Sequence, residues 1–125
     1  MTSSLCTPAL RAFAACAALL VVSAAGAQSL STLAPDCRTP GAAPEIPDGT
    51  KATEDDLVGA QKRLKAYLAD GDEYLSCLQS AEASLGDTIT PEQRAIVLGA
   101  YNAHVDVMQA LGESFNTAVR AFKAR

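Results

Sequence analysis

Two long stretches with apolar residues at helical spacing constrain the fold of this chain most. In the first stretch, apolar residues and one glycine form two registers, each with a seven-residue repeat. The second register is offset from the first by three residues. Such a repeat, sustained over about four heptads, is typical of a long amphipathic helix that packs along its whole length. The registers are Leu57, Leu64, Gly71, Leu78 and Leu85, and Ala60, Tyr67, Tyr74 and Ala81, widened by Leu68 and Leu75.

The second stretch follows residue 90 and has the same character. Its apolar residues alternate by three and four positions without a break, which is the spacing of one helix face. Two such stretches in a chain of 125 residues predict a single all-α domain. This second face consists of Leu98, Tyr101, Val105, Met108, Gly112, Phe115, Val119 and Phe122.

Local signals mark the ends of both predicted helices. Thr53 is a good N-cap, and three acids follow it where the helix dipole favours negative charge. The first helix is expected to stop at Gly86. Thr90 is the second N-cap, with Pro91 at the first helical position and Gln93 as its capping-box partner.

The short connection between the helices predicts an antiparallel hairpin of the coiled-coil kind over residues 53–125. Folding the chain about residues 86–90 sets a register in which each core glycine meets a larger side chain on the other helix. This register pairs Leu64 with Gly112, Gly71 with Val105, Leu75 with Tyr101, and Leu78 with Leu98.

Residues 37–52 form a different kind of segment, with three prolines and one large apolar residue, Ile46. This composition predicts an extended, polyproline-like arm. The pair Cys37 and Cys77 predicts one disulfide in an exported chain. Cys77 lies roughly 36 Å along the first helix. An extended arm reaches roughly 50 Å, so the bridge requires the arm to run back along the hairpin.

The N-terminus predicts export. Residues 1–27 combine one positive charge, an apolar run too short to span a bilayer, and Ala25-Gly26-Ala27 as a signal-peptidase site. The alternatives are a membrane anchor or core helix, and acylation at Cys16, whose flanking residues do not make the usual lipobox. Residues 28–36 lack periodicity and are expected to be a flexible tail. The predicted location is the periplasm or the extracellular space.

Charge and chemistry exclude several function classes. The net charge of −4 becomes −5 when Arg11 leaves with the signal peptide, which argues against nucleic acid or an anionic membrane as a partner. The chain is then expected to contact the membrane only through the signal peptide, before its cleavage. His104, the only histidine, is expected at the surface or helix edge. No nucleophile–base pair, phosphate loop or metal-ligand set is present, so the chain is predicted to be no enzyme and to carry no cofactor.

Two sets of residues are candidates for binding. Tyr67, Tyr74, Tyr101 and Asn102 either form a site or pack against the arm. A second stripe of small apolar residues lies beside the main face of the second helix and is a candidate surface for the arm, another hairpin or a partner helix. The stripe consists of Val97, Ala100, Val107, Leu111, Ala118 and Ala121.

The order of these motifs resembles a group of small exported bacterial proteins of uncharacterised function. The similarity rests on a pattern of cysteine, proline, Ile-Pro-Asp-Gly and Tyr-Leu-x-Cys-Leu that covers nearly the whole chain after the signal peptide. It implies export and the same stapled hairpin, and no activity. The matching residues are Cys37, Pro40, Ile46-Pro47-Asp48-Gly49, Ala52, Tyr74-Leu75, Cys77-Leu78, Tyr101-Asn102, Val105-Asp106 and Phe115-Asn116, whereas Leu57 stands where the group usually has Met.

The function predicted from these features is that of an exported interaction or structural module that binds a protein or a second copy of itself. The alternative is a small-molecule carrier or sensor with a site between the arm and the helices. An exposed, contiguous apolar face favours the first, and a polar pocket under the arm favours the second.

Overall fold

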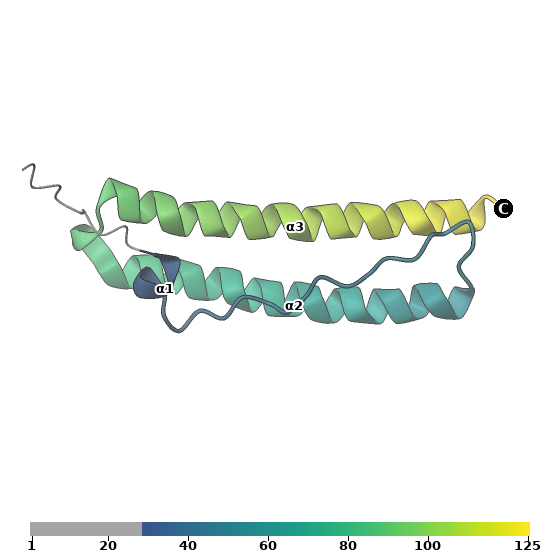
Figure 1. The fold of residues 1–125 in the computed structure, drawn as a ribbon, viewed down its shortest axis with the longest axis horizontal. Coiled ribbons are helices and arrows are strands. Elements are labelled where there is room, and N and C mark those ends of the chain that lie inside the picture. Colours follow the sequence, from purple (N-terminus) through teal and green to yellow (C-terminus); the bar gives the residue numbers. More distant parts are fainter. Residues whose placement is uncertain (1–28) are drawn as a thin grey trace, which may run out of the picture.

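The computed structural model describes residues 29–125. The predicted signal peptide, residues 1–27, and Gln28 lie outside the described residues. Two long helices, α2 (Glu54–Leu85) and α3 (Pro91–Lys123), pack side by side as an antiparallel hairpin (Figure 1). Residues 29–125 contain no strand, so the prediction of an all-α hairpin is confirmed.

The predicted helix boundaries are confirmed, and hydrogen bonds explain them. The Thr53 hydroxyl accepts from the Asp56 N–H at 3.1 Å, and the Asp56 carboxylate accepts from the Thr53 N–H at 2.8 Å. Thr90 and Gln93 make the same reciprocal pair before α3. Gly86, with a φ of 54°, follows α2 and leads into the short turn η1 (Gly86–Thr88). Local side-chain chemistry therefore satisfies the backbone groups that each helix end leaves free.

Two contacts confirm the cross-helix register. Glu82 of α2 forms an ion pair with Arg94 of α3. Farther along, Gly71 lies against His104 and Met108, on either side of the predicted level, and not against the predicted partner Val105, so a glycine does meet larger side chains there. The matching prediction at Gly112 is wrong, because a Cβ added at Gly112 would contact nothing within 4 Å.

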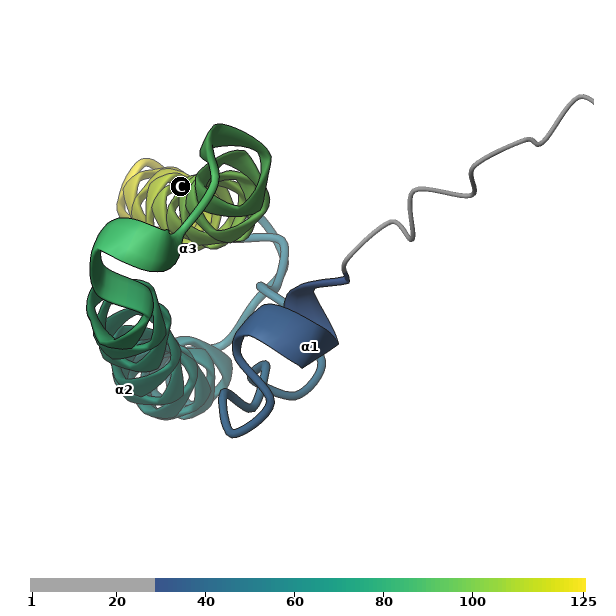
Figure 2. The ribbon, with the colours of Figure 1, turned by 90° about the vertical axis from the view of Figure 1, so that its left-hand side faces the viewer.

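The arm forms a third, non-helical layer. It leaves the Cys37–Cys77 disulfide, runs back beside α2, and crosses to the end of α3 before entering α2 (Figure 1). Seen along the helices, α1 (Leu30–Leu33) and the arm lie on one side of the hairpin (Figure 2). The predicted disulfide and extended arm are therefore both present.

The prediction that residues 28–36 form a flexible tail is corrected for its described part. Leu30–Leu33 form the one-turn helix α1, and the next residue, Ala34, is also buried. Leu33 and Ala34 pack in one apolar cluster with Tyr74, Leu78 and Val97. A single turn has no periodicity to read in the sequence, and its order comes from burial against the hairpin near the disulfide.

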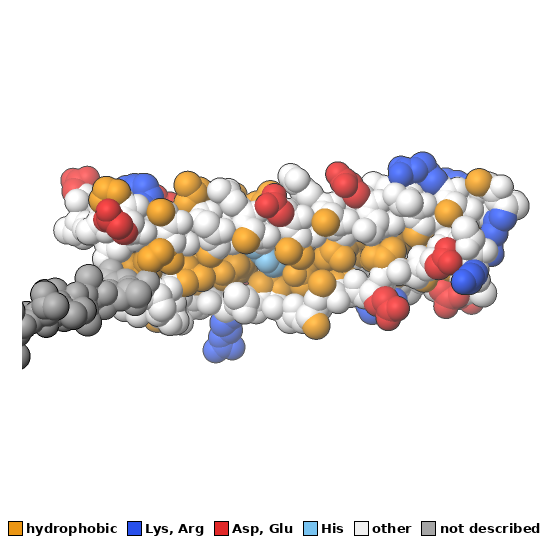
Figure 3. Space-filling view, turned by 45° about the horizontal axis from the view of Figure 1, so that its top comes forward, with side chains coloured by type: hydrophobic (Ala, Val, Ile, Leu, Met, Phe, Trp, Pro, Cys, Tyr) orange, Lys and Arg blue, Asp and Glu red, His pale blue; other side chains and the backbone are white. Residues whose placement is uncertain are grey.

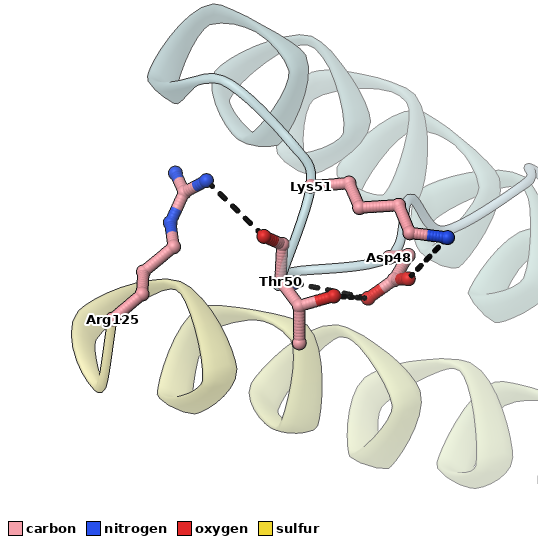
Figure 4. Close-up of polar contacts among 4 residues, drawn as sticks. All are labelled: Asp48, Thr50, Lys51 and Arg125. Atoms are coloured by element: carbon pink, nitrogen blue, oxygen red, sulfur yellow. Dashed lines mark hydrogen bonds and ion pairs between the residues drawn. The ribbon is translucent and has the colours of Figure 1, made fainter.

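The far end of the arm is held by the C-terminus. The Asp48 carboxylate accepts hydrogen bonds from the N–H and hydroxyl of Thr50, which close a turn (Figure 4). The Arg125 guanidinium donates to the carbonyl of Thr50 at 3.4 Å and to that of Ala52 at 2.6 Å. Its Cζ also lies 4.3 Å from the centroid of the Phe122 ring. The arm is thus fixed at both ends, by Cys77 at one and Arg125 at the other.

The third layer changes which face of α3 is buried. The predicted register sets Leu98 against Leu78 in the seam, but Leu98 is 50% exposed, whereas its neighbour Val97 is only 2% exposed. The physical reason is the position of α1, because it covers the side of α3 that carries Val97. The buried centre therefore lies among α2, α3 and the N-terminal layer, and it is displaced from the plane of the hairpin.

Candidate binding surfaces

The predicted stripe on α3 is partly covered by the N-terminal layer. Val97 is buried under α1 in the cluster that includes Leu33. At the other end, Ala118 is 6% exposed, and Gly49 of the arm lies so close that a Cβ there would overlap the Ala118 backbone. The arm therefore takes part of the stripe, which is one of the alternatives that the sequence leaves open.

The C-terminal half of the stripe lines a groove beneath the arm, and Ala100 and Val107 lie outside it. Val107 is 39% exposed, and Ala100 is partly buried. Leu111, Ala118 and Ala121 line an open groove of about 720 Å³. Its other wall is the arm, and the chemistry of the lining is mixed rather than apolar throughout. The remaining lining residues are Pro44, Ile46, Pro47, Asp48, Gly49, Ala110, Glu113, Ser114 and Thr117.

His104 lies at the edge of the seam and is partly buried, which agrees with the predicted helix-edge position. Its ring centroid is 5.2 Å from that of Tyr74, edge to face, and 5.9 Å from that of Tyr67. A Cβ at Gly71 would lie 2.7 Å from Nε2 of His104 and 2.9 Å from Sδ of Met108. In Figure 3, a band of hydrophobic side chains along the molecule is interrupted by one histidine.

The imidazole of His104 packs against aromatic rings of α2 while part of the side chain stays exposed. Nε2 of His104 is buried and has no hydrogen-bond partner among the described residues. Tyr67 and Tyr74 contact the imidazole through their rings, and these contacts hold both tyrosines against α3. Within residues 29–125, no group of three or more His, Cys, Asp or Glu side chains is placed to hold a metal ion.

The tyrosines and the asparagines differ in burial. Tyr74 is 5% exposed, and Tyr101 is partly buried against the cluster around Leu78. Asn102 and Asn116 are exposed. Across residues 29–125, no hydrogen bond joins either asparagine to the arm, whose Thr50 and Ala52 carbonyls are bound by Arg125 instead.

A second apolar surface lies on the side of the hairpin away from the arm, and we call it the open face. Its hollows are lined by α2 and α3 alone. Most of these residues are predicted from sequence to lie in the seam, because their heptad register is as regular as that of the buried row. The open face consists of Val58, Leu68 and Leu75 of α2 and Leu98, Val105, Gly112 and Val119 of α3, all partly or largely exposed.

The middle of the open face has a border with few charges, whereas Glu82 lines the hollow at one end, and Glu54 and Lys123 line the hollow at the other. On α3, the row next to Leu98 and Val105 is uncharged over residues 95–116 and holds three exposed amides at seven-residue spacing. On α2, the equivalent row carries one cation, Lys65, and one anion, Asp72. The α3 row is Ala95, Asn102, Gln109 and Asn116, and the α2 row is Val58, Lys65, Asp72 and Gln79.

Comparison with known proteins gives no family assignment. No protein-family model, no curated protein and no solved structure matches this chain. Among the described helices, none has a stretch both long and apolar enough to cross a membrane. The surfaces themselves are therefore the basis for a functional proposal.

Proposed function

We propose that this protein is an exported, disulfide-stapled helical hairpin that works by binding another protein chain through its open face. The observation that carries the proposal is the exposure of large apolar side chains in helical register. Leu98 is 50% exposed and Val58 is 43% exposed. Large apolar side chains exposed along one side of a helical hairpin are typical of an interaction site, whereas single apolar surface residues are ordinary.

Export is part of the proposal and has three supports. The N-terminal pattern of residues 1–27 is that of a signal peptide. The Cys37–Cys77 bond agrees with an oxidising compartment, the periplasm or the extracellular space. The resemblance to small exported bacterial proteins points the same way. N-terminal sequencing of exported material is expected to begin at Gln28; retention of Met1 would refute export.

The binding role is tested by changing each of the two surfaces separately. Leu98→Glu with Val105→Glu places two charges on the open face, and Val107→Glu with Leu111→Glu places two on the arm side. We expect only the first pair to change the mass of the protein in solution or its cross-linked partners, while both pairs keep the wild-type helix content. If neither pair changes the mass or the partners, the binding role is refuted.

The groove beneath the arm favours a second candidate function, a small-molecule carrier or sensor. Its volume of about 720 Å³ is within the range of ligand pockets, and Ile46 and Leu111 provide apolar contact. The groove is open, and its wall is polar in part, which favours an amphipathic ligand. A Leu111→Trp variant, which narrows the groove, should then weaken binding of an apolar fluorescent probe, with Val107→Trp as the control.

A further inference from the structure

We propose that the partner of the open face is a second copy of this chain, packed antiparallel about a two-fold axis to form a four-helix bundle. This inference rests on the proposed function, because it names the occupant of the same face. Three observations carry it. The charges on α2 are complementary to those of a second copy, and the glycine of α3 is complementary to a valine of a second copy. The two-fold axes that these two pairings require lie at the same level along the hairpin.

The charges at the border of α2 are self-complementary. Lys65 and Asp72 are exposed and share a row of the heptad. When two copies of α2 run antiparallel about an axis midway between these residues, Lys65 of each copy lies opposite Asp72 of the other. The same axis places Val58 opposite Gln79. Two symmetry-related ion pairs therefore form, as an isologous interface requires.

The residues on the open face of α3 are complementary in size in the same way. A Cβ at Gly112 would meet nothing within 4 Å, so the helix surface is hollow there. When two copies of α3 run antiparallel about an axis midway between Val105 and Gly112, the valine of each copy faces the hollow of the other. Leu98 and Val119 share that midpoint and lie opposite one another. Small and large residues thus alternate across the proposed interface.

The two axes coincide along the hairpin. On α2, the midpoint of Lys65 and Asp72 lies between Leu68 and Ala69. On α3, the midpoint of Val105 and Gly112 lies between Met108 and Gln109. The cross-helix contacts place these two levels side by side, because Gly71, three residues beyond Leu68, lies between His104 and Met108 on the antiparallel helix. The Glu82–Arg94 ion pair gives the same alignment to within one residue. A single two-fold axis therefore satisfies both helices.

The low charge of the face suits a second copy of an acidic chain. The chain carries a net charge of −4, so most of its surface repels another copy. The α3 row with Asn102, Gln109 and Asn116 brings amides together, and these both donate and accept hydrogen bonds. Between Glu54 and Glu82 at its two ends, the face of α2 carries one cation and one anion, which attract in the antiparallel arrangement, whereas a parallel dimer sets like charges against each other. The antiparallel arrangement also brings Glu82 level with Glu54 of the other copy, and Glu82 is already paired with Arg94 of its own chain.

A charge swap tests this arrangement directly. The purified exported protein is expected to reach twice its chain mass by sedimentation equilibrium as its concentration rises. Lys65→Glu and Asp72→Lys should each raise the dissociation constant roughly tenfold at low salt, because each puts like charges together twice. The double variant restores opposite charges and should return close to wild type. Lys62→Glu, an exposed charge reversal off the open face, is the control.

A glycine pair provides a second, charge-independent test. Gly112→Leu fills the proposed hollow and should weaken the dimer at least tenfold while helix content is kept. Gly99→Leu is the matched control, since a Cβ at Gly99 also meets nothing within 4 Å but lies outside the open face. Equal effects of the two leucines on the dimer would contradict the inference.

The remaining outcomes separate this inference from the proposed function. A protein that stays monomeric at all concentrations, or a dimer unaffected by the charge swap, overturns the antiparallel self-association. If the open-face variants Leu98→Glu with Val105→Glu then lose a different cross-linked protein, the binding role stands with another partner. If they lose nothing, both proposals fail.

Discussion

Nε2 of His104 occupies the space that a side chain at Gly71 would fill, 2.7 Å from the Cβ position. The glycine lies in the middle of α2 in a buried register of the helix, where glycine weakens helix formation. Its presence is explained by the imidazole and by Met108, which together take up the room. The absence of a side chain at Gly71 thus gives room to the buried Nε2 edge of an imidazole from the facing helix.

The Gly71–His104 contact predicts a loss of stability on enlarging the glycine. Gly71→Leu is expected to lower the free energy of unfolding by about 1–3 kcal/mol, because the added side chain displaces the imidazole and the Met108 thioether. Urea titration measures the change. Gly99→Leu, in open space, should be neutral or stabilising, since it only removes a helix-weakening glycine. A further His104→Ala change should recover part of the loss in Gly71→Leu.

Reduction of the Cys37–Cys77 bond is expected to release α1 before the hairpin unfolds. The bond closes a loop with a sequence separation of 40 residues, so its loss should cost about 4 kcal/mol in the chain-entropy account. Hydrogen exchange should then rise first at residues 30–34, whose burial depends on the tether. Thiol labelling without reductant should find no free sulfhydryl in the native protein. Unchanged exchange at α1 after Cys37→Ser would contradict the prediction.

The Thr53–Asp56 capping box predicts acid sensitivity at the start of α2. Hydrogen bonds from the backbone N–H of Thr53 and then from its hydroxyl lower the pKa of the Asp56 carboxyl below its ordinary value of 3.8. A carboxyl with a lower pKa in the folded state contributes stability above the unfolded pKa and loses it as the pH falls through the folded pKa. Asp56→Asn should therefore remove part of the stability change below about pH 4. Asp55→Asn, in the same turn, is the control, and equal acid transitions for the two variants would contradict the assignment.

The C-terminal Arg125 is expected to hold the junction of arm and α2. Arg125→Ala should destabilise the protein by about 1–2 kcal/mol, because it removes donors to the Ala52 and Thr50 carbonyls and the stacking on Phe122. Thermal unfolding measures the loss, and Lys123→Ala is the matched control. Arg125→Lys should keep only part of the effect, since an ammonium cannot serve both carbonyls in the same planar geometry. Equal melting temperatures for Arg125→Ala and Lys123→Ala would refute this role.

The two sides of the hairpin differ in how far their surfaces can be predicted. The stripe with Val97 and Ala118 is recognisable in the sequence as a second face, and the structure shows that α1 and the arm cover both of these residues. The open face is not distinguishable in the sequence, because Leu98 and Val119 fit the heptad of a buried seam as well as their neighbours do. Periodicity reports which residues share a face and leaves open which of two adjacent faces meets the core.

The helix ends, the extended arm, the cysteine pair and the approximate level at which the two helices lie side by side can all be derived from the amino-acid sequence. They follow from local chemistry, as at Thr53 and Thr90, or from simple length, as in the reach of the arm to Cys77. The burial of Val97 beside an exposed Leu98, and the order of the residues around Leu33, depend instead on tertiary packing. The physical reason is that neighbouring positions on a helix differ by about 100° of rotation, so the layer docked on one side selects between them.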